Sequence, residues 1–280
     1  ASFKYNWNDE LITASRYGEV ESYSYLPSGG FKSFNGALPQ NTSAQTNLIP
    51  RSRIEKPYLF DEFGNLESND RVKKTEFDGF GRLVRAETAS DVVEFGYDDD
   101  GRRIYKIVKP KNATLPALQS LYPLETLNIE PKGPESFVFV GDQRLARIEH
   151  ASKNWFFYLK DHLGSSDIMM DRSGKPVEQM LYKSYGTEVD VKAKSSLWSS
   201  YLDTNAEILP KEKTHHRFTG QYLDDDTGLY YYGARYYDAE LGRFISADPH
   251  FIENPEGCLS STLGVWALCV FASEEYRSYR

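Results

Sequence analysis

The feature that most constrains this chain is a short unit that recurs along it: an aromatic residue, Asp, two variable residues, Gly, and then Arg or Asn. Three clear copies occupy residues 60–65, 77–82 and 97–102, so the unit recurs about every 20 residues. An Asp side chain can accept hydrogen bonds from backbone N–H groups two residues further on, and Gly takes the positive φ that a tight turn needs. Each unit therefore predicts a tight reversal of the chain.

The stretches beside these turns alternate between apolar and polar residues, as in residues 92–97 and 103–108. A period of two indicates strands, so each repeat predicts a β-hairpin, and successive hairpins are expected to pair edge to edge. We expect aromatic residues at equivalent positions to stack across neighbouring strands. One hairpin cannot bury its own face, so the unit works only in an array. A weaker copy and later variants occupy residues 25–29, 171–175, 225–229 and 237–243.

Three segments interrupt the repeat. Residues 26–57 are rich in Pro, Gly, Ser and Asn, residues 109–136 contain five prolines, and residues 191–214 are polar with little alternation. We interpret them as loops or insertions on the array, because similar units lie on both sides of each.

Composition limits the classes of function. The 20 Tyr and 16 Phe residues suit pleated sheets, in which one face of a ring packs and a hydroxyl stays in water. A net charge of −8 without a basic cluster disfavours a nucleic-acid partner.

Cys258 and Cys269 are the two cysteines, and they could pair or remain free thiols. The longest apolar run, residues 263–272, is too short to span a membrane. The opening residues contain no Met and no signal region, which favours an excised piece.

Acidic and histidine clusters are assigned to turns rather than to metal sites. A calcium-binding loop of the EF-hand type that begins at Asp98 would need Glu where the chain has Lys109. We therefore interpret residues 98–100 and 224–226 as solvated turns. His162 has no second ligand at a useful spacing and is expected to stabilise a turn. The adjacent histidines at 215 and 216 would face opposite ways on a strand. No metal or cofactor is expected.

From residue 137 onward the chain resembles the Rhs repeat-associated core domain of bacterial polymorphic toxins and of the C components of insecticidal Tc toxins. The resemblance rests on an ordered series of blocks, and the preceding units look like the tyrosine/aspartate (YD) repeats of the same proteins. The blocks are Y-L-K-D-H-L-G-S (residues 158–165), Y-G (185–186), R-F-T-G-Q-Y (217–222), T-G-L-Y-Y-Y-G-A-R-Y-Y-D (227–238) and L-G-R-F-I-S-A-D-P (241–249).

The resemblance implies an all-β fold: YD-repeat hairpins in a spiral sheet that forms part of a hollow shell, closed by a C-terminal Rhs-core plug. It divides the chain into a YD-repeat shell segment with loop insertions (residues 1–136), the core domain (137–249) and a diverged or truncated tail (250–280). The implied function is to encapsulate and deliver a C-terminal toxic polypeptide. The implied partners are this cargo and either further YD-repeat shell or a Tc-type B component, and the implied location is secreted or on a bacterial cell surface.

In the family, the core domain cleaves the chain after itself by an aspartyl-protease-like reaction that requires an Arg and an Asp, which correspond here to Arg235 and Asp248. An aspartic mechanism also needs a second carboxyl group. The family supplies it in a second D-P-x-G motif, whereas this chain continues with N-P-E-G at residues 254–257. Either the tail has diverged or is truncated, or Asn254 stands where an Asp is needed. We expect an ion pair between Arg235 and Asp248 and no dyad, since Glu253 and Glu256 do not match the family's position.

Three functions remain: an encapsulating wall, an active self-cleaving protease module, and a cell-surface adhesion or carbohydrate-binding array such as YD repeats build in the teneurin ectodomain. The core-domain blocks favour the wall, because they mark the end of a shell and the start of its cargo. About seven hairpins make an arc rather than a closed vessel, so the chain is expected to expose apolar surface that more shell or another subunit would cover.

Overall fold

The computed structural model describes residues 2–16, 19–25, 31–34, 58–61, 63–189 and 213–248. These residues form strands and turns, and their one helical piece is the short 3₁₀ turn η3 (Phe218–Gly220). The expectation of an all-β fold is confirmed. Cys258, Cys269, the tail 250–280 with its apolar run, and most of the expected loops at 26–57 and 191–214 lie outside the described residues.

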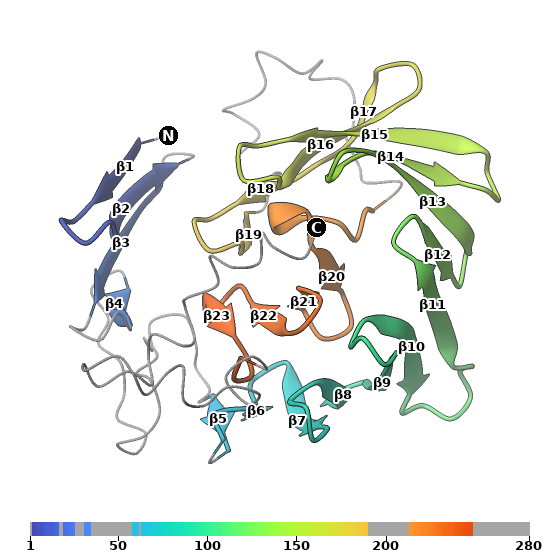
Figure 1. Ribbon diagram of the computed structural model, residues 1–280, viewed down its shortest axis with the longest axis horizontal. Helices are drawn as coiled ribbons and strands as arrows, with labels where there is room; N and C mark the ends of the chain where they lie inside the picture. Colours follow the sequence, from blue (N-terminus) through green and yellow to red (C-terminus); the bar gives the residue numbers. More distant parts are fainter. Residues whose placement is uncertain are drawn as a thin grey trace.

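The largest element is a sheet of 11 strands whose spatial order is their order in the sequence. Every neighbouring pair is antiparallel, so the chain runs back and forth as a meander. Figure 1 shows this sheet curving through the lower, right-hand and upper parts of the molecule. Its strands are β7 (Val72–Phe77), β8 (Leu83–Thr88), β9 (Asp91–Tyr97), β10 (Arg103–Pro110), β11 (Leu118–Leu124), β12 (Leu127–Glu130), β13 (Gly133–Val140), β14 (Gln143–Glu149), β15 (Asn154–Lys160), β16 (Ser166–Asp171) and β17 (Pro176–Gln179).

A second sheet of four strands lies inside this arc, and we call it the C-terminal sheet (Figure 1). It consists of β20 (Tyr222–Asp224), β21 (Leu229–Tyr231), β22 (Tyr236–Asp238) and β23 (Arg243–Phe244). We call the face of the large sheet that contacts it the concave face. Two short hairpins complete this part: β5 (Leu59–Phe60) with β6 (Leu66–Ser68), and β18 (Leu181–Tyr182) with β19 (Glu188–Val189).

A separate N-terminal sheet is formed by β1 (Ser2–Tyr5), β2 (Leu11–Arg16), β3 (Glu19–Tyr25) and β4 (Phe31–Phe34). It contacts the turn between β18 and β19. The hydroxyls of Tyr25 and Tyr185 are 2.9 Å apart, and the Ser184 hydroxyl donates to Glu21 over 2.9 Å. The N-terminal sheet is therefore tied to the same body by polar contacts.

The repeated unit forms the turn that its residues predict. In the copy at residues 77–82, Asp78 Oδ1 accepts the N–H groups of Phe80 and Arg82, both at 2.9 Å. Gly81 follows with φ 74°, a left-handed conformation that is easiest for glycine. The same pattern recurs at Asp61, Asp161 and Asp171. The turn at Asp161, which contains His162, is thus another copy of the repeat.

The expected stacking of equivalent aromatic residues is wrong. Among the described residues, Phe60, Phe77 and Tyr97 form no ring pair with one another, and each packs against the buried core instead. The Arg82 guanidinium lies over the Tyr97 ring, 5.0 Å from its centroid. The ring of one repeat therefore packs against the arginine that ends the preceding turn, a cation–π contact. Ring pairs across neighbouring strands do occur in the C-terminal sheet, as between Tyr231 and Tyr236.

The interpretation of residues 109–136 as a loop is also wrong, because β11, β12 and the first half of β13 lie there. Proline is tolerated at strand ends and irregular positions, where no ladder N–H is needed. Pro110 is the last residue of β10, Pro123 lies where the pairing of β11 with β12 shifts register, and Pro131 lies between β12 and β13. The sheet also runs without a break across the expected boundary at residues 136 and 137, inside β13. The separate roles of the two segments stay a prediction.

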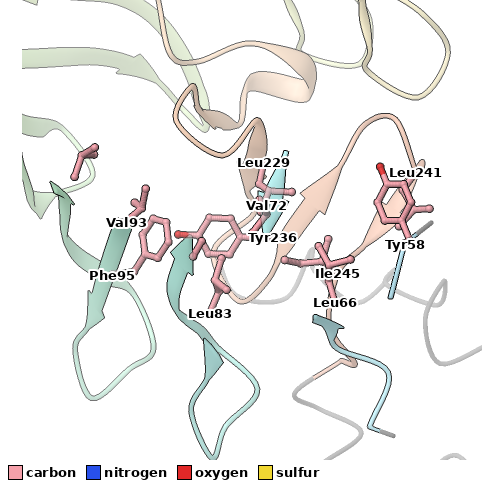
Figure 2. Close-up of a cluster of buried hydrophobic side chains, with 12 residues drawn as sticks. Tyr58, Leu66, Val72, Leu83, Val93, Phe95, Leu229, Tyr236, Leu241 and Ile245 are labelled. Carbon is pink, nitrogen blue, oxygen red and sulfur yellow. The ribbon is translucent and has the colours of Figure 1, made fainter. Parts of the chain in front are cut away.

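The main core lies between the lower strands of the large sheet and the C-terminal sheet. Figure 2 shows Leu83, Val93 and Phe95 of the large sheet facing Tyr236 of β22. The Phe95 and Tyr236 ring centroids are 5.2 Å apart. Burying a large apolar side chain contributes about 1.5–3 kcal/mol. Neither sheet covers these residues alone, so the C-terminal sheet completes the core of the large one.

The opposite, convex face of the upper strands is apolar and open. Strand β15 shows the alternation: Phe156 is 3% exposed on the concave face, whereas Phe157 is 37% exposed on the convex face. We call the exposed set the convex patch: Leu121, Ile129, Val138, Val140, Trp155, Phe157 and Leu159. The expectation that this chain exposes apolar surface is thus met by the described residues, and a patch of this kind is typical of a surface that another body covers.

Candidate functional site

The two residues expected to carry the chemistry lie together. Arg235 immediately precedes β22, and Asp248 is the last residue that the structure describes. Their side chains form an ion pair with Arg235 Nη2 and Asp248 Oδ2 2.7 Å apart. Arg235 is buried and Asp248 is partly exposed, and the guanidinium also lies 3.8 Å from the centroid of the Phe244 ring. The expected pairing is confirmed, and its catalytic role stays a prediction.

This geometry places a carboxylate directly beside a guanidinium. A charged carboxylate can act as a base toward water, but an aspartic mechanism requires a second carboxyl group that shares the proton. The downstream candidates Glu253 and Glu256, together with Asn254, lie outside the described residues. The described part therefore contains one carboxylate and one arginine of the predicted site.

A second acidic residue, Asp224 at the end of β20, is fully buried and joins the C-terminal sheet to the large sheet. Its Oδ2 pairs with the guanidinium of Arg103, and its Oδ1 is 3.1 Å from Lys106 Nζ. Both cations project from β10. Arg103 also donates to the Tyr236 hydroxyl over 3.0 Å and lies 4.4 Å from the ring centroids of both Tyr122 and Tyr231. We call this cluster the Asp224 lock.

The electrostatics of the Asp224 lock favour the charged state of all three groups. Burial alone would raise the pKa of Asp224, but the charges of Arg103 and Lys106 outweigh it and hold this pKa below its usual value. Burial likewise opposes the charged form of Lys106, but Asp224 together with Tyr122 and Asp226 outweighs that effect, so the pKa of Lys106 is raised. A buried carboxylate between two cations is therefore stable only while all partners remain in place.

A parallel lock holds the other end of the C-terminal sheet. Asp238, the fully buried last residue of β22, accepts hydrogen bonds at Oδ2 from Tyr58, Asn69 and Arg71 at 3.1, 3.2 and 2.8 Å. Its Oδ1 accepts the backbone N–H of Glu240 at 2.9 Å, which closes the following turn. We call this cluster the Asp238 lock. This cluster connects β22 and the turn after it to residues 58–71, which precede β7.

The upper part of the concave face is lined by buried charge of a similar kind. Arg217, just before η3, pairs with Glu178 of β17 at 3.3 Å and with Glu188 of β19. Arg147 of β14 pairs with Glu135 of β13 at 3.2 Å and donates to the carbonyl oxygen of Lys213 at 3.2 Å. The segment around residues 213–217 is thus held against the large sheet by paired arginines and carboxylates.

Two expectations for acidic and histidine residues need correction. The interpretation of residues 224–226 as a solvated turn is wrong for Asp224, because its side chain is an anchor between two sheets. His215 and His216 both contact the Tyr222 ring, at centroid distances of 4.8 and 5.3 Å, rather than facing opposite ways. Burial lowers the pKa of both imidazoles. In the described ranges no group of His, Cys, Asp and Glu side chains could hold a metal ion.

The residues that sequence reasoning missed are the partners of these buried acids. One signal for Arg103 was available. In the first two copies of the repeat, the residue after the turn is Leu66 or Leu83, and both are buried. The third copy has Arg103 at that position, so a charged residue stands where the pattern requires an apolar one. A buried arginine needs an acidic partner, and that requirement pointed to a carboxylate elsewhere in the chain.

A family model described as Teneurin YD-shell matches residues 1–257. Salivary gland surface protein 1 of Aedes aegypti is 27% identical over 260 residues, which cover 83% of this chain and 7% of that protein. Double-stranded DNA deaminase toxin A of Burkholderia cenocepacia is 27% identical over 244 residues, or 71% of this chain and 16% of the toxin. The tRNA nuclease WapA of Bacillus subtilis is 24% identical, over 85% of this chain and 9% of that protein.

Solved structures share the fold. The Tc holotoxin pore of Photorhabdus luminescens superimposes with a TM-score of 0.63 at 18% identity, over 89% of this chain and 14% of that one. The TcdB2-TccC3 complex superimposes with a TM-score of 0.52 at 16% identity, over 89% of this chain and 16% of that one. This chain thus spans a small part of the proteins that it matches. No helix within the described part of the chain is long and apolar enough to cross a membrane.

The Asp224 lock gives the first prediction. Asp224→Asn keeps the shape of the side chain but leaves Arg103 and Lys106 without a counter-charge, so we expect the free energy of unfolding to fall by about 3–5 kcal/mol. The neighbouring Asp225→Asn, at a half-exposed carboxylate near His215, should change it by less than about 1 kcal/mol. Urea unfolding at pH 7.5 measures both.

The pH dependence has a defined sign. The folded-state pKa of Asp224 is below the unfolded-state value of about 3.9. Its contribution to stability is therefore full at neutral pH and is lost as the pH falls below about 4 toward the folded-state pKa. The difference in stability between the wild-type chain and Asp224→Asn should shrink over that range. A difference that stayed constant down to pH 3, or equal effects of the two substitutions at pH 7.5, would contradict the lock.

Proposed function

This chain belongs to the Teneurin YD-shell family, and we propose that it is the closing wall segment of a secreted toxin shell that encloses a polypeptide cargo. The observation that supports the proposal most is the position of the C-terminal sheet inside the arc of an 11-stranded meander, where buried ion pairs anchor it. Such an arrangement closes the concave side of a wall. It also determines on which side the following residues start.

The direction of the chain supports enclosure. Asp248 is paired with Arg235, which lies in the C-terminal sheet region within the arc (Figure 1). Asp248, the last described residue, therefore lies on the concave side of the wall. In the proposed function, the polypeptide that follows the closing segment is thereby delivered into the interior of the shell.

The meander supports a wall rather than a compact domain. An antiparallel sheet built from one repeated hairpin can be extended at its edges without changing the repeat. Within the described residues, β17 has one paired edge, and the convex patch has no cover. The relatives are many times longer than this chain, so we propose that further YD-repeat shell, or a Tc-type B component, pairs with and covers these surfaces.

The names of the relatives support the proposal that this chain helps to deliver a toxin, but they do not identify the cargo. A deaminase toxin and a tRNA nuclease are named for the activity of the whole protein, whereas this chain matches 16% and 9% of them. What the matched regions share is the family of the wall. We therefore propose an extracellular toxin whose cargo differs between relatives, and we expect the wall itself, with its net charge of −8, not to bind nucleic acid.

A second candidate function is a cell-surface binding array. Trp155 and Phe157 expose stacked rings on the convex face, with centroids 6.4 Å apart. Exposed aromatic rings suit sugar or protein binding, and one relative is named as a surface protein. The locks on the concave side favour the first function, because a surface array does not require a closed interior.

Enclosure is tested with the full-length parent protein. We expect the segment that follows residue 280 to resist proteinase K under native conditions, while an exposed loop such as residues 112–117 is cut. Exposure to a pH below about 4, where the contribution of Asp224 to stability is lost, should make the segment accessible. Immediate digestion of this segment at neutral pH, at the rate of the same segment expressed alone, would contradict enclosure and favour the surface array.

Whether this chain cleaves itself is a separate question, and the Arg235–Asp248 pair supplies the residue to mutate in its test. We expect this chain, extended with its native downstream sequence, to keep its intact mass, because the family's second D-P-x-G motif is replaced by N-P-E-G. Mass spectrometry of this protein beside its Asp248→Asn variant measures it. A fragment that forms in the parent and disappears in Asp248→Asn would show that the site is active and that our expectation is wrong.

A further inference from the structure

A positively charged site lies at the rim of the large sheet, away from the locks. Arg144, in β14, places its guanidinium over the rings of Phe137 and Phe139, at 5.2 and 5.1 Å from their centroids. Its Nη1–H donates to the carbonyl oxygen of Gly220 in η3 over 2.9 Å. Its Nε is buried without a hydrogen bond, and within the described residues the side chain pairs with no carboxylate.

A second cation meets the first at the same point. Lys160, the last residue of β15, lies close to Gly220. Its Nζ is 3.8 Å from the position that a Cβ atom would occupy on Gly220. Burial lowers the pKa of Arg144 and of Lys160, and the charge of Arg144 lowers that of Lys160 further. Tyr158 and Glu125 act in the opposite direction on Arg144, as Asp142 does on Lys160, but neither cation forms an ion pair in the part of the chain that the structure describes.

The backbone beside these cations is strained and firmly held. Thr219 has φ 50°, which is uncommon for a β-branched residue and costs on the order of 1–3 kcal/mol. Its N–H donates to the Ser165 hydroxyl over 3.0 Å, and its hydroxyl is 2.6 Å from that of Tyr232. Strain that surrounding contacts maintain is typical of positions where the backbone is shaped for a ligand. Here it presents the Gly220 carbonyl to Arg144.

We propose that Arg144 and Lys160, converging on the turn at residues 219–220, bind a carboxylate of a polypeptide ligand. Two partly buried cations without an acidic partner repel each other, and one carboxylate bound beside both of them offsets the repulsion. A singly charged carboxylate matches two groups better than a phosphate, which presents three acceptor oxygens. That the polypeptide is the enclosed cargo rests on the proposed function; the binding of a carboxylate does not.

The test uses acetate as the carboxylate probe, with chloride at the same ionic strength as reference, and follows thermal unfolding of the 280-residue chain by intrinsic Tyr and Trp fluorescence. Binding to the folded state raises the Tm, and we expect 0.2 M acetate to raise it by about 2–4 °C relative to chloride. Lys160→Gln should lose most of this increment, whereas Lys160→Arg should keep it. Lys175→Gln, which removes an exposed charge from the turn after β16, is the matched control and should also keep it.

A second readout separates a ligand site from a structural role. Without acetate, Lys160→Gln should have a Tm equal to or above that of the wild-type chain, because the substitution removes a like charge beside Arg144. A lower Tm would mean that Lys160 is already paired and would overturn the proposal. Equal increments in Lys160→Gln and Lys175→Gln would overturn it as well, since they would show a general salt effect. Neither result depends on whether the parent protein encloses a cargo.

Discussion

The structure depends on the buried ion pairs of Asp224 with Arg103 and Lys106. A curved sheet of hairpins leaves one face without cover, and a hairpin array has no other means of filling it. The C-terminal sheet fills the lower part of that face with apolar side chains, but apolar contacts do not fix its position. Charged partners do, because a displaced Asp224 would leave three ions buried without counter-charges. The Asp238 lock and the Arg217 pairs extend the same constraint along the face.

The two faces of the wall have opposite chemistry. The concave face combines apolar residues with paired charges, whereas the convex face of the upper strands carries the exposed apolar patch. The concave face thus buries apolar residues as an open sheet is expected to do, but the convex face departs from that expectation because it is apolar and exposed. An apolar convex face is consistent with a segment that works within a larger shell, where in the proposed function the convex side meets another surface.

Much of the local structure could be predicted from the sequence. The aspartate and glycine of each repeat fix a turn through their own hydrogen bonds, so Asp78 and Gly81 behave as their local chemistry requires. The motif blocks also placed Arg235 near Asp248. Residues 109–136 were not predicted as strands, because prolines such as Pro123 mark turns unless a register shift accommodates them. The partners of Asp224 were not predicted, because they lie on β10, and a turn-like run of acidic residues does not show which member is buried.

Hydrogen exchange measured by mass spectrometry tests most directly the claim that the C-terminal sheet and the wall form one unit. Amides of β20–β22 and of β9–β10 should exchange with similar protection, since opening one requires breaking the lock that holds the other. The N-terminal sheet, which contacts the turn between β18 and β19 through hydrogen bonds and the Tyr23–Tyr185 ring pair, lies outside the two locks and should exchange faster than both. Rapid exchange throughout β20–β22 while β9–β10 stays protected would show that the C-terminal sheet opens independently, and it would contradict the account of a locked, closed wall.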